Sequence, residues 1–245
     1  MQEVSVIIPC YNAARYIGNA IDSILIQNVS CEIIIVDDNS VDNTKEVIKE
    51  YLKLDNFYYY HFGKKAGVAA ARNFGVSKAS GKFIAFLDAD DIWVEGKLKK
   101  QLCVIEKEKV VICYTGRQNI TDSGKIIGKA IKVKESVNYL ELSLHNEIPC
   151  SSVLIRKEVA KEFPMEHDEY HEDYLTWLKC VKKYGRAIGI DEPLIYYRKS
   201  VSGKSRNPWK SIKMVYGVHR CMKRGYIKSS FFTLSHIICG LTRYI

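Results

Sequence analysis

Through its first hundred residues the chain alternates short, continuously apolar segments with segments whose apolar residues recur at helical spacing. The apolar segments have the length and the Val, Ile, Phe and Tyr content of strands. A strand that is apolar at consecutive positions is buried on both faces, which is typical of a parallel sheet covered by helices. The sequence therefore predicts an α/β fold with a mainly parallel central sheet flanked by helices. We expect strands over residues 4–8, 31–36, 57–61 and 82–87, and helices over 16–27, 44–52 and 68–79.

Beyond residue 97 the pattern is mixed, and no internal repeat is present. We expect strands over 110–114 and 153–156 and a helix over 174–183. The last segment, 209–245, reads as one or two basic amphipathic helices, with Gly225 as a break. We therefore divide the chain into a main domain, 1–200, with halves of 1–100 and 101–200, and a helical tail, 201–245.

The net charge of +9 comes from the end of the chain. From Pro193 onward there are eleven Lys or Arg residues and no Asp or Glu, which leaves 26 basic against 28 acidic residues before it. A basic tail suits anionic lipid headgroups, nucleic acid or an acidic substrate. Because neither zinc-finger spacing nor the aromatic motif of an RRM is present, we expect no nucleic-acid partner.

The location that the sequence predicts is the cytoplasm. No segment approaches the roughly 20 apolar residues of a spanning helix, and the N-terminus lacks the regions of a signal peptide. The eight cysteines never form a CxxC motif, so reduced thiols are expected rather than a disulfide framework or a zinc site.

Polar clusters follow three of the expected strands: Tyr11-Asn12, residues 37–40 and residues 88–91. In open α/β sheets, ligands bind outside the carboxyl ends of the strands. We therefore expect these three clusters to converge on one crevice.

The cluster at 88–91 holds Asp88, Asp90 and Asp91 directly after an apolar strand. Three carboxylates so close together repel one another, and a cation would offset that cost. Mg2+ and Mn2+ prefer such oxygen ligands and commonly share them with substrate phosphates. The alternative is that Asp90 or Asp91 only caps a helix that follows.

The cluster at 37–40 places Asp37 and Asp38 toward the same crevice. A carboxylate there can accept hydrogen bonds from a nucleobase N–H or from ribose hydroxyls. The GxGxxG and P-loop fingerprints are both absent, so phosphates must be bound by a metal and by basic side chains. Lys64, Lys65 and Arg72 are near enough in sequence to do so, although a helical arginine often only faces solvent.

A third acidic pair, Glu172 and Asp173, enters the helix expected near 174–183. Acidic residues in a first turn favour the helix dipole, so the pair has a structural explanation. A carboxylate at this place could also deprotonate an acceptor hydroxyl, and either residue could serve as that base.

Five motifs in order resemble family 2 glycosyltransferases with the GT-A fold, over roughly residues 4–200. They are VIIPCYN (6–12), IIVDDNS (34–40), AAARN (69–73), GKFIAFLDADD (81–91) and HEDYLTWL (171–178). The closest likeness is to bacterial O-antigen, capsule and exopolysaccharide enzymes. Two positions depart from the family: Asn39 stands where glycine is common, and Lys64-Lys65 stands where asparagine often occurs.

The resemblance implies a role for each motif residue. Asp38 would accept the uracil N3–H, Asp37 would lie beside the ribose, and Arg72 would approach the base or the phosphates. Asp90 would bind the divalent ion, with Asp88 near it and near the ribose or sugar. The nucleotide-sugar site as a whole would comprise Pro9, Tyr11, Asn12, Asp37, Asp38, Arg72, Asp88 and Ala89. Asp173 would be the catalytic base, with Glu172 beside it, and would give inversion at the anomeric carbon.

The activity implied is transfer of a hexose, glucose or galactose, from a UDP-sugar to a lipid-diphosphate-linked saccharide, with Mn2+ or Mg2+ as cofactor. Residues 1–100 would be the nucleotide-binding half and 101–200 the acceptor-binding half. The basic tail would rest on the cytoplasmic face of the inner membrane, pack on the catalytic domain or form a homodimer. The alternatives are a catalytically silent nucleotide-sugar binding module, another donor (a GDP- or dTDP-sugar, UDP-GlcNAc or UDP-GalNAc) and a non-lipid acceptor.

Overall fold

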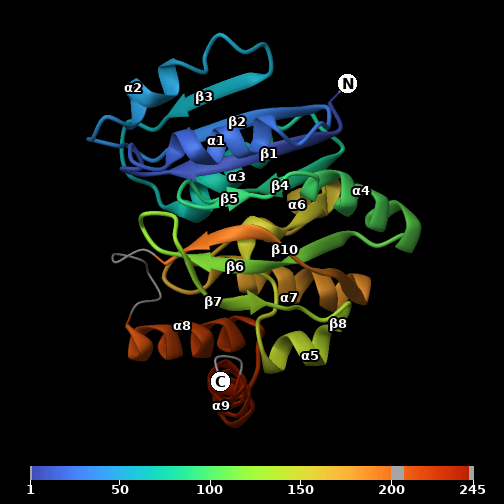
Figure 1. Cartoon of the computed structure of the whole chain (residues 1–245). Helices are drawn as coiled ribbons and strands as arrows, with labels where there is room; N and C mark the ends of the chain where they lie inside the picture. The colour runs from blue at the N-terminus through green and yellow to red at the C-terminus, as the bar shows by residue number, and fades with distance from the viewer. Residues whose placement is uncertain (1, 200–206, 243–245) are drawn as a thin grey trace.

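The computed structural model describes residues 2–199 and 207–242 and shows one large sheet with helices on both of its faces (Figure 1). The strands are β1 (Val4–Cys10), β2 (Cys31–Asp37), β3 (Phe57–His61), β4 (Phe83–Phe86), β5 (Ile92–Trp93), β6 (Ile112–Ile120), β7 (Ile126–Ile131), β8 (Ser136–Asn138), β9 (Leu154–Arg156) and β10 (Arg186–Arg198). The helices are α1 (Ile17–Leu25), α2 (Thr44–Lys49), α3 (Val68–Lys78), α4 (Lys97–Glu108), α5 (Tyr139–Leu144), α6 (Lys157–Glu162), α7 (Glu172–Tyr184), α8 (Pro208–Cys221) and α9 (Tyr226–Thr242), with a 3-10 turn, η1 (Cys150–Ser152). The predicted elements of the first hundred residues are all present, although α2 ends three residues earlier than expected.

The strands follow the order β3-β2-β1-β4-β9-β6-β10-β5. The first four of these are parallel to one another, as the apolar runs predicted. The second half is mixed: β6 and β10 are parallel, whereas β9 runs antiparallel to both β4 and β6. The short strands β5, β7 and β8 also pair antiparallel. The parallel strands are therefore the half of the sheet that positions the candidate site.

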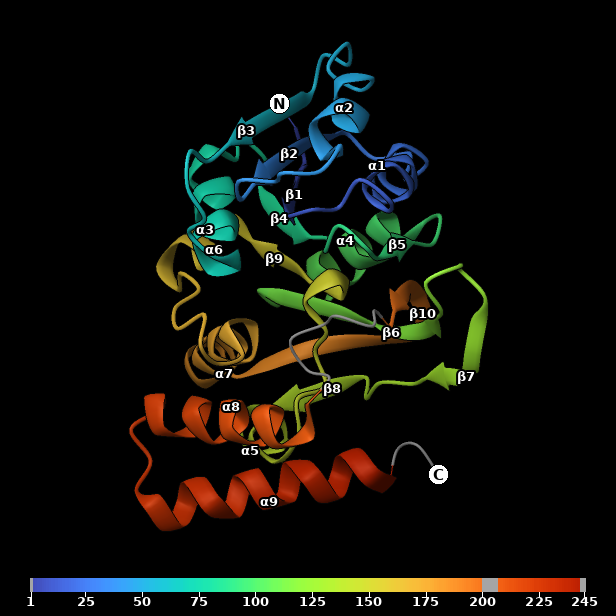
Figure 2. The same cartoon turned by 90° about the vertical axis from the view of Figure 1, so that its left-hand side faces the viewer.

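The sheet separates two apolar layers, and the alternation within β1 shows how. Ile7 points into the layer formed with α3, α6 and α7, whereas Val6 and Ile8 point into the layer formed with α1 and α4. All seven residues of β1 are buried, so the prediction of strands covered on both faces is confirmed. Figure 2 shows the two helical layers on either side of the sheet.

The tail forms two helices, and Gly225 lies in the break between them, as predicted. α8 packs against α7, and α9 packs against α8 and α5 at the edge of the molecule (Figure 2). The expected boundary at 200/201 lies outside the described residues, so the domain division stays a prediction. Among the helices in the described ranges, none has both the length and the apolar content needed to cross a membrane.

Candidate active site

The loops after β1, β2 and β4 lie at one edge of the sheet because these strands are parallel neighbours. The first two loops are joined directly. The backbone N–H of Asn12 donates to Ser40 Oγ at 2.9 Å, and the N–H of Val41 donates to Asn12 Oδ1 at 2.9 Å. Residues that are 28 positions apart in the sequence thus form one polar rim. This agrees with the prediction that the polar clusters converge.

Asn39 stands where the resembled family commonly has glycine, and its backbone explains why asparagine is tolerated. Its φ is +68°, in the left-handed region that most L-residues avoid. Asparagine enters this region more readily than other non-glycine residues because its short side chain can hydrogen-bond locally. Asparagine at position 39 can therefore adopt the loop conformation that glycine allows in the family.

Both aspartates of the second cluster are buried and held by the protein. Asp37 accepts from the backbone N–H of Ser40 at 2.8 Å and from the Tyr59 hydroxyl at 2.8 Å. Asp38 accepts from the backbone N–H groups of Ala66, at 2.6 Å, and Gly67, at 2.9 Å. Because a carboxylate offers about four lone-pair positions, two such contacts leave Asp38 able to accept from a ligand as well.

The solvent side of this rim carries an aromatic ring and two cations. Tyr11 is 44% exposed, and Lys65 Nζ lies 3.5 Å from the centre of its ring. Lys64 is also exposed. Pro9 and Ala89 are buried beneath the rim, so they shape it rather than present polar groups.

Arg72 joins the acids of two distant segments. Its Nη2 lies 2.6 Å from Asp88 Oδ1, at the end of β4, and its Nη1 lies 2.8 Å from Glu172 Oε1, in the first turn of α7. The arginine is buried, because α3 packs on the sheet through the face that carries it. The structure thus places the guanidinium between two carboxylates and makes it the centre of the acidic site.

The three acids at 88–91 have different surroundings. The side chain of Asp88 is 32% exposed, so it faces both Arg72 and solvent. Asp91 is buried and accepts from the Ser151 hydroxyl at 2.6 Å and from the backbone N–H of Arg198 at 2.9 Å. The alternative that Asp90 or Asp91 caps a helix is wrong, because β5 follows them and Gly96 precedes α4.

Of the three acids in this loop, Asp90 has the fewest partners in the described protein to balance its negative charge. In the described parts of the chain it forms no salt bridge, since the Arg198 guanidinium donates to backbone carbonyls of Asp90, Thr121 and Asp122. Burial, followed by the charge of Asp88, raises the pKa of Asp90 to about 6. Such an excess of carboxylate oxygens fits a hard divalent cation.

A complete metal site made by the protein alone is absent from the described residues, because no three His, Cys, Asp or Glu side chains are grouped to hold an ion. This agrees with the way Mg2+ and Mn2+ are usually bound, through one or two carboxylates and the phosphates of a substrate. Asp90 and Asp88 are the residues that could supply those carboxylates.

Asp173 lies beside Glu172 in the first turn of α7 and is half-buried. Burial, followed by the charge of Glu172, raises the pKa of Asp173 to about 7, although Arg72 acts in the opposite direction. Glu172 is more enclosed, with a side chain only 9% exposed and committed to Arg72. Of the two acids, Asp173 is therefore the better placed to exchange a proton near neutral pH.

Three residues that the sequence did not single out for the site support it. Ser151, in η1, links the loop at 88–91 by donating to Asp91 and accepting from the backbone N–H of Asp88 at 3.1 Å. Arg198 holds the same loop from the end of β10. Asp168 accepts from the backbone N–H of Ala69 at 2.9 Å in the first turn of α3. None lies in a local motif that marks it, because each acts on a segment far away in the sequence.

We expect Ser151→Ala to weaken donor use without unfolding the protein. The change removes the hydroxyl that holds Asp91 and leaves a buried carboxylate with one partner fewer, at a cost of about 1–3 kcal/mol. The donor KM should rise by about tenfold as the loop at 88–91 loses its fixed position. Steady-state kinetics with Ser152→Ala as the control would measure this, since Ser152 donates only to the Pro149 carbonyl. An unchanged donor KM would show that Ser151 does not position the loop.

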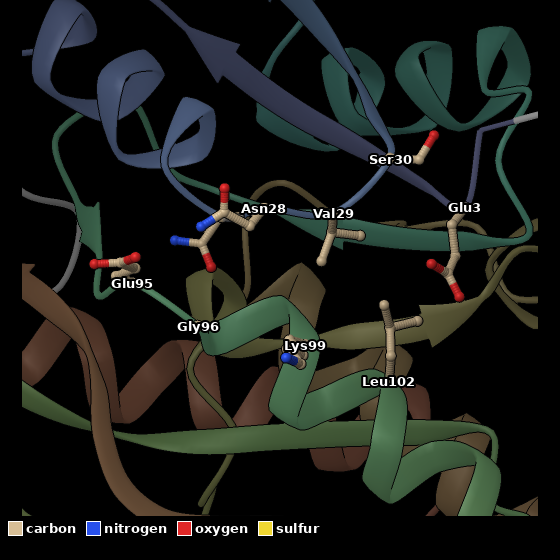
Figure 3. A pocket seen from close by; sticks show the side chains of 9 residues that line it. Glu3, Asn28, Val29, Ser30, Glu95, Gly96, Lys99 and Leu102 are labelled. Carbon is tan, nitrogen blue, oxygen red and sulfur yellow. The ribbon is translucent and has the colours of Figure 1, made fainter.

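A separate hollow of about 550 Å3 lies at the opposite end of the strands (Figure 3). Glu3 and Ser30, which line it, precede β1 and β2, and Lys99 and Leu102 come from α4. The hollow is therefore at the amino ends of the parallel strands, away from Asp38, Asp88 and Arg72. We do not assign it to the candidate site.

The family model described as "Glycosyl transferase family 2" matches residues 5–163. The Escherichia coli protein WfgD, named UDP-Glc:alpha-D-GlcNAc-diphosphoundecaprenol beta-1,3-glucosyltransferase, is 32% identical over 98% of this chain and 94% of its own length. The Bacillus subtilis (strain 168) protein TuaG, whose name assigns it provisionally to teichuronic acid biosynthesis, is 35% identical over 90% of this chain and 88% of its own. Staphylococcus aureus TarS in complex with UDP-GlcNAc superposes with a TM-score of 0.74 at 18% identity, over 95% of this chain and 70% of that one. The architecture is the GT-A fold that the motifs led us to expect.

Proposed function

The chain belongs to glycosyltransferase family 2, and on that premise we propose that it transfers a hexose from a UDP-sugar to a lipid-diphosphate-linked saccharide. The transfer would invert the anomeric carbon and serve bacterial surface polysaccharide biosynthesis. The support for donor and acceptor is the likeness to WfgD, whose name states UDP-Glc and a GlcNAc-diphosphoundecaprenol acceptor. WfaP of Escherichia coli, 32% identical over 86% of this chain, carries the same reaction in its name.

The observation that carries the proposal is the gathering of three acids, Asp88, Glu172 and Asp173, around one buried arginine, with Asp90 and Asp91 beside Asp88. Arg72 pairs with Asp88 and Glu172, and the other three acids, Asp90, Asp91 and Asp173, have raised pKa values. A nucleotide diphosphate entering such a site would meet net negative charge, so its binding calls for an additional cation. One acid near neutral pKa would then remain to act as a base.

In the proposed mechanism the nucleotide lies along the rim formed after β1 and β2. Asp38 accepts from the base edge, and Lys64 and Lys65 lie on the side where the diphosphate would pass. A divalent cation held by Asp90 and Asp88 would act as a Lewis acid on the departing diphosphate. Asp173 holds the acceptor hydroxyl and takes its proton as the oxygen attacks the anomeric carbon from the face opposite the diphosphate.

We propose the same division of the chain into a nucleotide-binding half and an acceptor-binding half. The residues proposed for the donor lie within 1–100, and the proposed base lies in the second half, on α7. Arg72 connects the two, because its guanidinium reaches across to Glu172, 100 residues further along the chain. We propose that the acceptor lies against α7, beside Asp173.

A donor screen tests the proposal directly. The purified chain is incubated with Mn2+ and a synthetic GlcNAc-diphosphate-lipid, and UDP-Glc, UDP-Gal, UDP-GlcNAc, UDP-GalNAc, GDP-Man and dTDP-Glc are compared. We expect transfer from UDP-Glc or UDP-Gal, with the linkage read by NMR. Transfer only from another donor would replace the proposed sugar nucleotide. Tight UDP binding without turnover of any donor would favour a catalytically silent binding module.

We expect kcat/KM to fall tenfold per pH unit below about pH 7. The pKa of Asp173 in the unliganded protein is raised to about 7 from 3.8, so acidification protonates the base and removes its capacity to accept the acceptor proton. Initial rates at donor and acceptor concentrations well below their KM values, between pH 5.5 and 9, would give the profile, with circular dichroism confirming that the fold persists. A kcat/KM that stays level down to pH 5.5 would exclude a base with this pKa.

A further inference from the structure

The side of helix α9 that faces the protein carries both polar and apolar residues. Ser229 and Thr233 are buried against the body of the molecule, where the Thr233 hydroxyl donates to the Ser229 carbonyl at 2.8 Å. His236 also faces inward and accepts from the backbone N–H of Asn146 at 3.4 Å. The half-buried Phe232 lies against His219 of α8. An ordinary surface helix buries its apolar stripe, whereas α9 leaves much of its apolar surface exposed.

The outward side is a continuous apolar stripe, which we call the outer face of α9. It consists of Ile227, Phe231, Leu234 and Ile238, which are 88%, 60%, 57% and 53% exposed. Their spacing of four, three and four residues places them in one row along the helix. Figure 2 shows α9 as the outermost element of this end of the molecule, with α8 and α5 on its inner side.

The segment that carries this face is cationic. Four lysines of α8, α9 and the turn between them are exposed: Lys210, Lys213, Lys223 and Lys228. No Asp or Glu occurs anywhere after Glu192. An exposed apolar stripe on a helix that also carries an exposed lysine, Lys228, within a segment free of acids, matches a surface that is apolar within and anionic at its border.

We propose that the outer face of α9 lies in the headgroup region of an anionic lipid bilayer, with the helix parallel to the membrane plane. α8 lies between α9 and α7, and the Ser211 hydroxyl of α8 lies 3.5 Å from His171 Nε2, two residues before Asp173. A bilayer against α9 is therefore on the side of the proposed acceptor site. This proposal rests on the proposed function in one respect only: the bilayer is the phase that would hold the acceptor lipid.

A second copy of the chain is a poorer occupant of this face. Two outer faces packed together would bring two lysine-bearing helices together, with no acid of the tail to balance Lys228 of either copy. Like charges brought together across an interface are unfavourable. Anionic headgroups supply the missing charge, and the acyl boundary accepts the apolar side chains.

The test uses the full chain, because removing the tail would uncover Val215 and Val218, which are part of the core. The variant Phe231→Gln, Leu234→Gln, Ile238→Gln changes only exposed side chains of α9. The control Leu25→Gln, Leu52→Gln, Ile126→Gln changes three other exposed apolar side chains, which are 49%, 48% and 65% exposed. Each protein is sedimented with vesicles of phosphatidylglycerol and phosphatidylethanolamine, and with vesicles of phosphatidylcholine alone.

We expect the unmodified chain and the control to sediment with the anionic vesicles, and the α9 variant to bind at least about tenfold more weakly. Binding should also fall as NaCl is raised, since screening weakens the attraction of the lysines. Equal vesicle binding by the α9 variant overturns the proposal. So does a dimer of the unmodified chain that the α9 variant loses, without any vesicle binding, because a second copy would then cover the face.

The same proteins separate this proposal from the proposed function. Transfer to a short-chain, water-soluble GlcNAc-diphosphate acceptor should be the same in the α9 variant as in the unmodified chain. If no donor supports transfer while the unmodified chain still binds anionic vesicles, the proposed activity fails and the surface stands. If transfer proceeds but vesicles are not bound, the surface fails alone.

Discussion

Asp173→Asn should lower kcat by about a thousandfold while leaving the fold and donor binding intact, because a positioned general base contributes about 10^2–10^4 in rate. The amide keeps the shape of the side chain but cannot take the acceptor proton. The position is half-buried in the first turn of α7, beside the ion pair of Arg72 with Glu172. The pKa that is raised to about 7 is the value that suits a base working near neutral pH.

Initial-rate kinetics at saturating substrates, with UDP binding by calorimetry, would measure this loss. The matched control is Glu169→Gln, which makes the same change of charge just before α7, at a side chain that is 59% exposed and that, among the residues the structure describes, forms a salt bridge only with His167. The control should keep its activity. A kcat within about threefold of normal in Asp173→Asn would remove this residue from the role of base, and Glu172 would then be the next acid to test.

Asp90→Asn should nearly abolish transfer and weaken the binding of Mn2+ in the presence of UDP by about a hundredfold. The residue carries a carboxylate without a salt bridge among the described residues, in a loop where burial and Asp88 raise its pKa to about 6. Removing one of two anionic ligands weakens the attraction for a divalent cation strongly in a partly desolvated site. It should not destabilise the protein, since the native acid gains little from its surroundings.

Mn2+ electron paramagnetic resonance in the presence of UDP would measure the affinity independently of turnover, and thermal unfolding would report the stability. Asp55→Asn, at an exposed position before β3, is the control for the change of charge. Unchanged Mn2+ affinity in Asp90→Asn would show that the cation, if bound, is held by other groups. A large fall in melting temperature would instead assign Asp90 a structural role.

The two acids Asp90 and Asp91 illustrate where sequence reasoning stopped. They are adjacent and identical in chemistry, and only the resemblance to family 2 glycosyltransferases assigned the divalent ion to Asp90 rather than to Asp91. The structure separates them, because Asp91 is buried against Ser151 and Arg198 while Asp90 keeps its carboxylate apart from such partners in the described chain. The deciding contacts come from residues 60 and 107 positions away. No local pattern encodes them.

Arg72 is a similar case, with a different outcome. Its motif placed it in the site, and the sequence assigned its charge to the base or phosphates of a donor. In the fold the guanidinium holds Asp88 and Glu172 together, and its contact with a donor stays a prediction. Only the packing of α3 against the sheet, and of α7 beyond it, decided which anions it would meet.

The sequence by itself determined the strands and helices predicted over residues 4–87 and the edge at which the polar clusters meet. Apolar periodicity reports which face of a segment is buried, and parallel strands bring their carboxyl ends together whatever the loops contain. The tertiary structure decided the antiparallel place of β9, the different surroundings of the acids and the apolar outward face of α9. These depend on contacts between residues far apart along the chain, whose geometry is fixed only when whole elements pack. The residue type sets the chemistry that is available to a side chain, and the residues packed around it determine which contacts it makes.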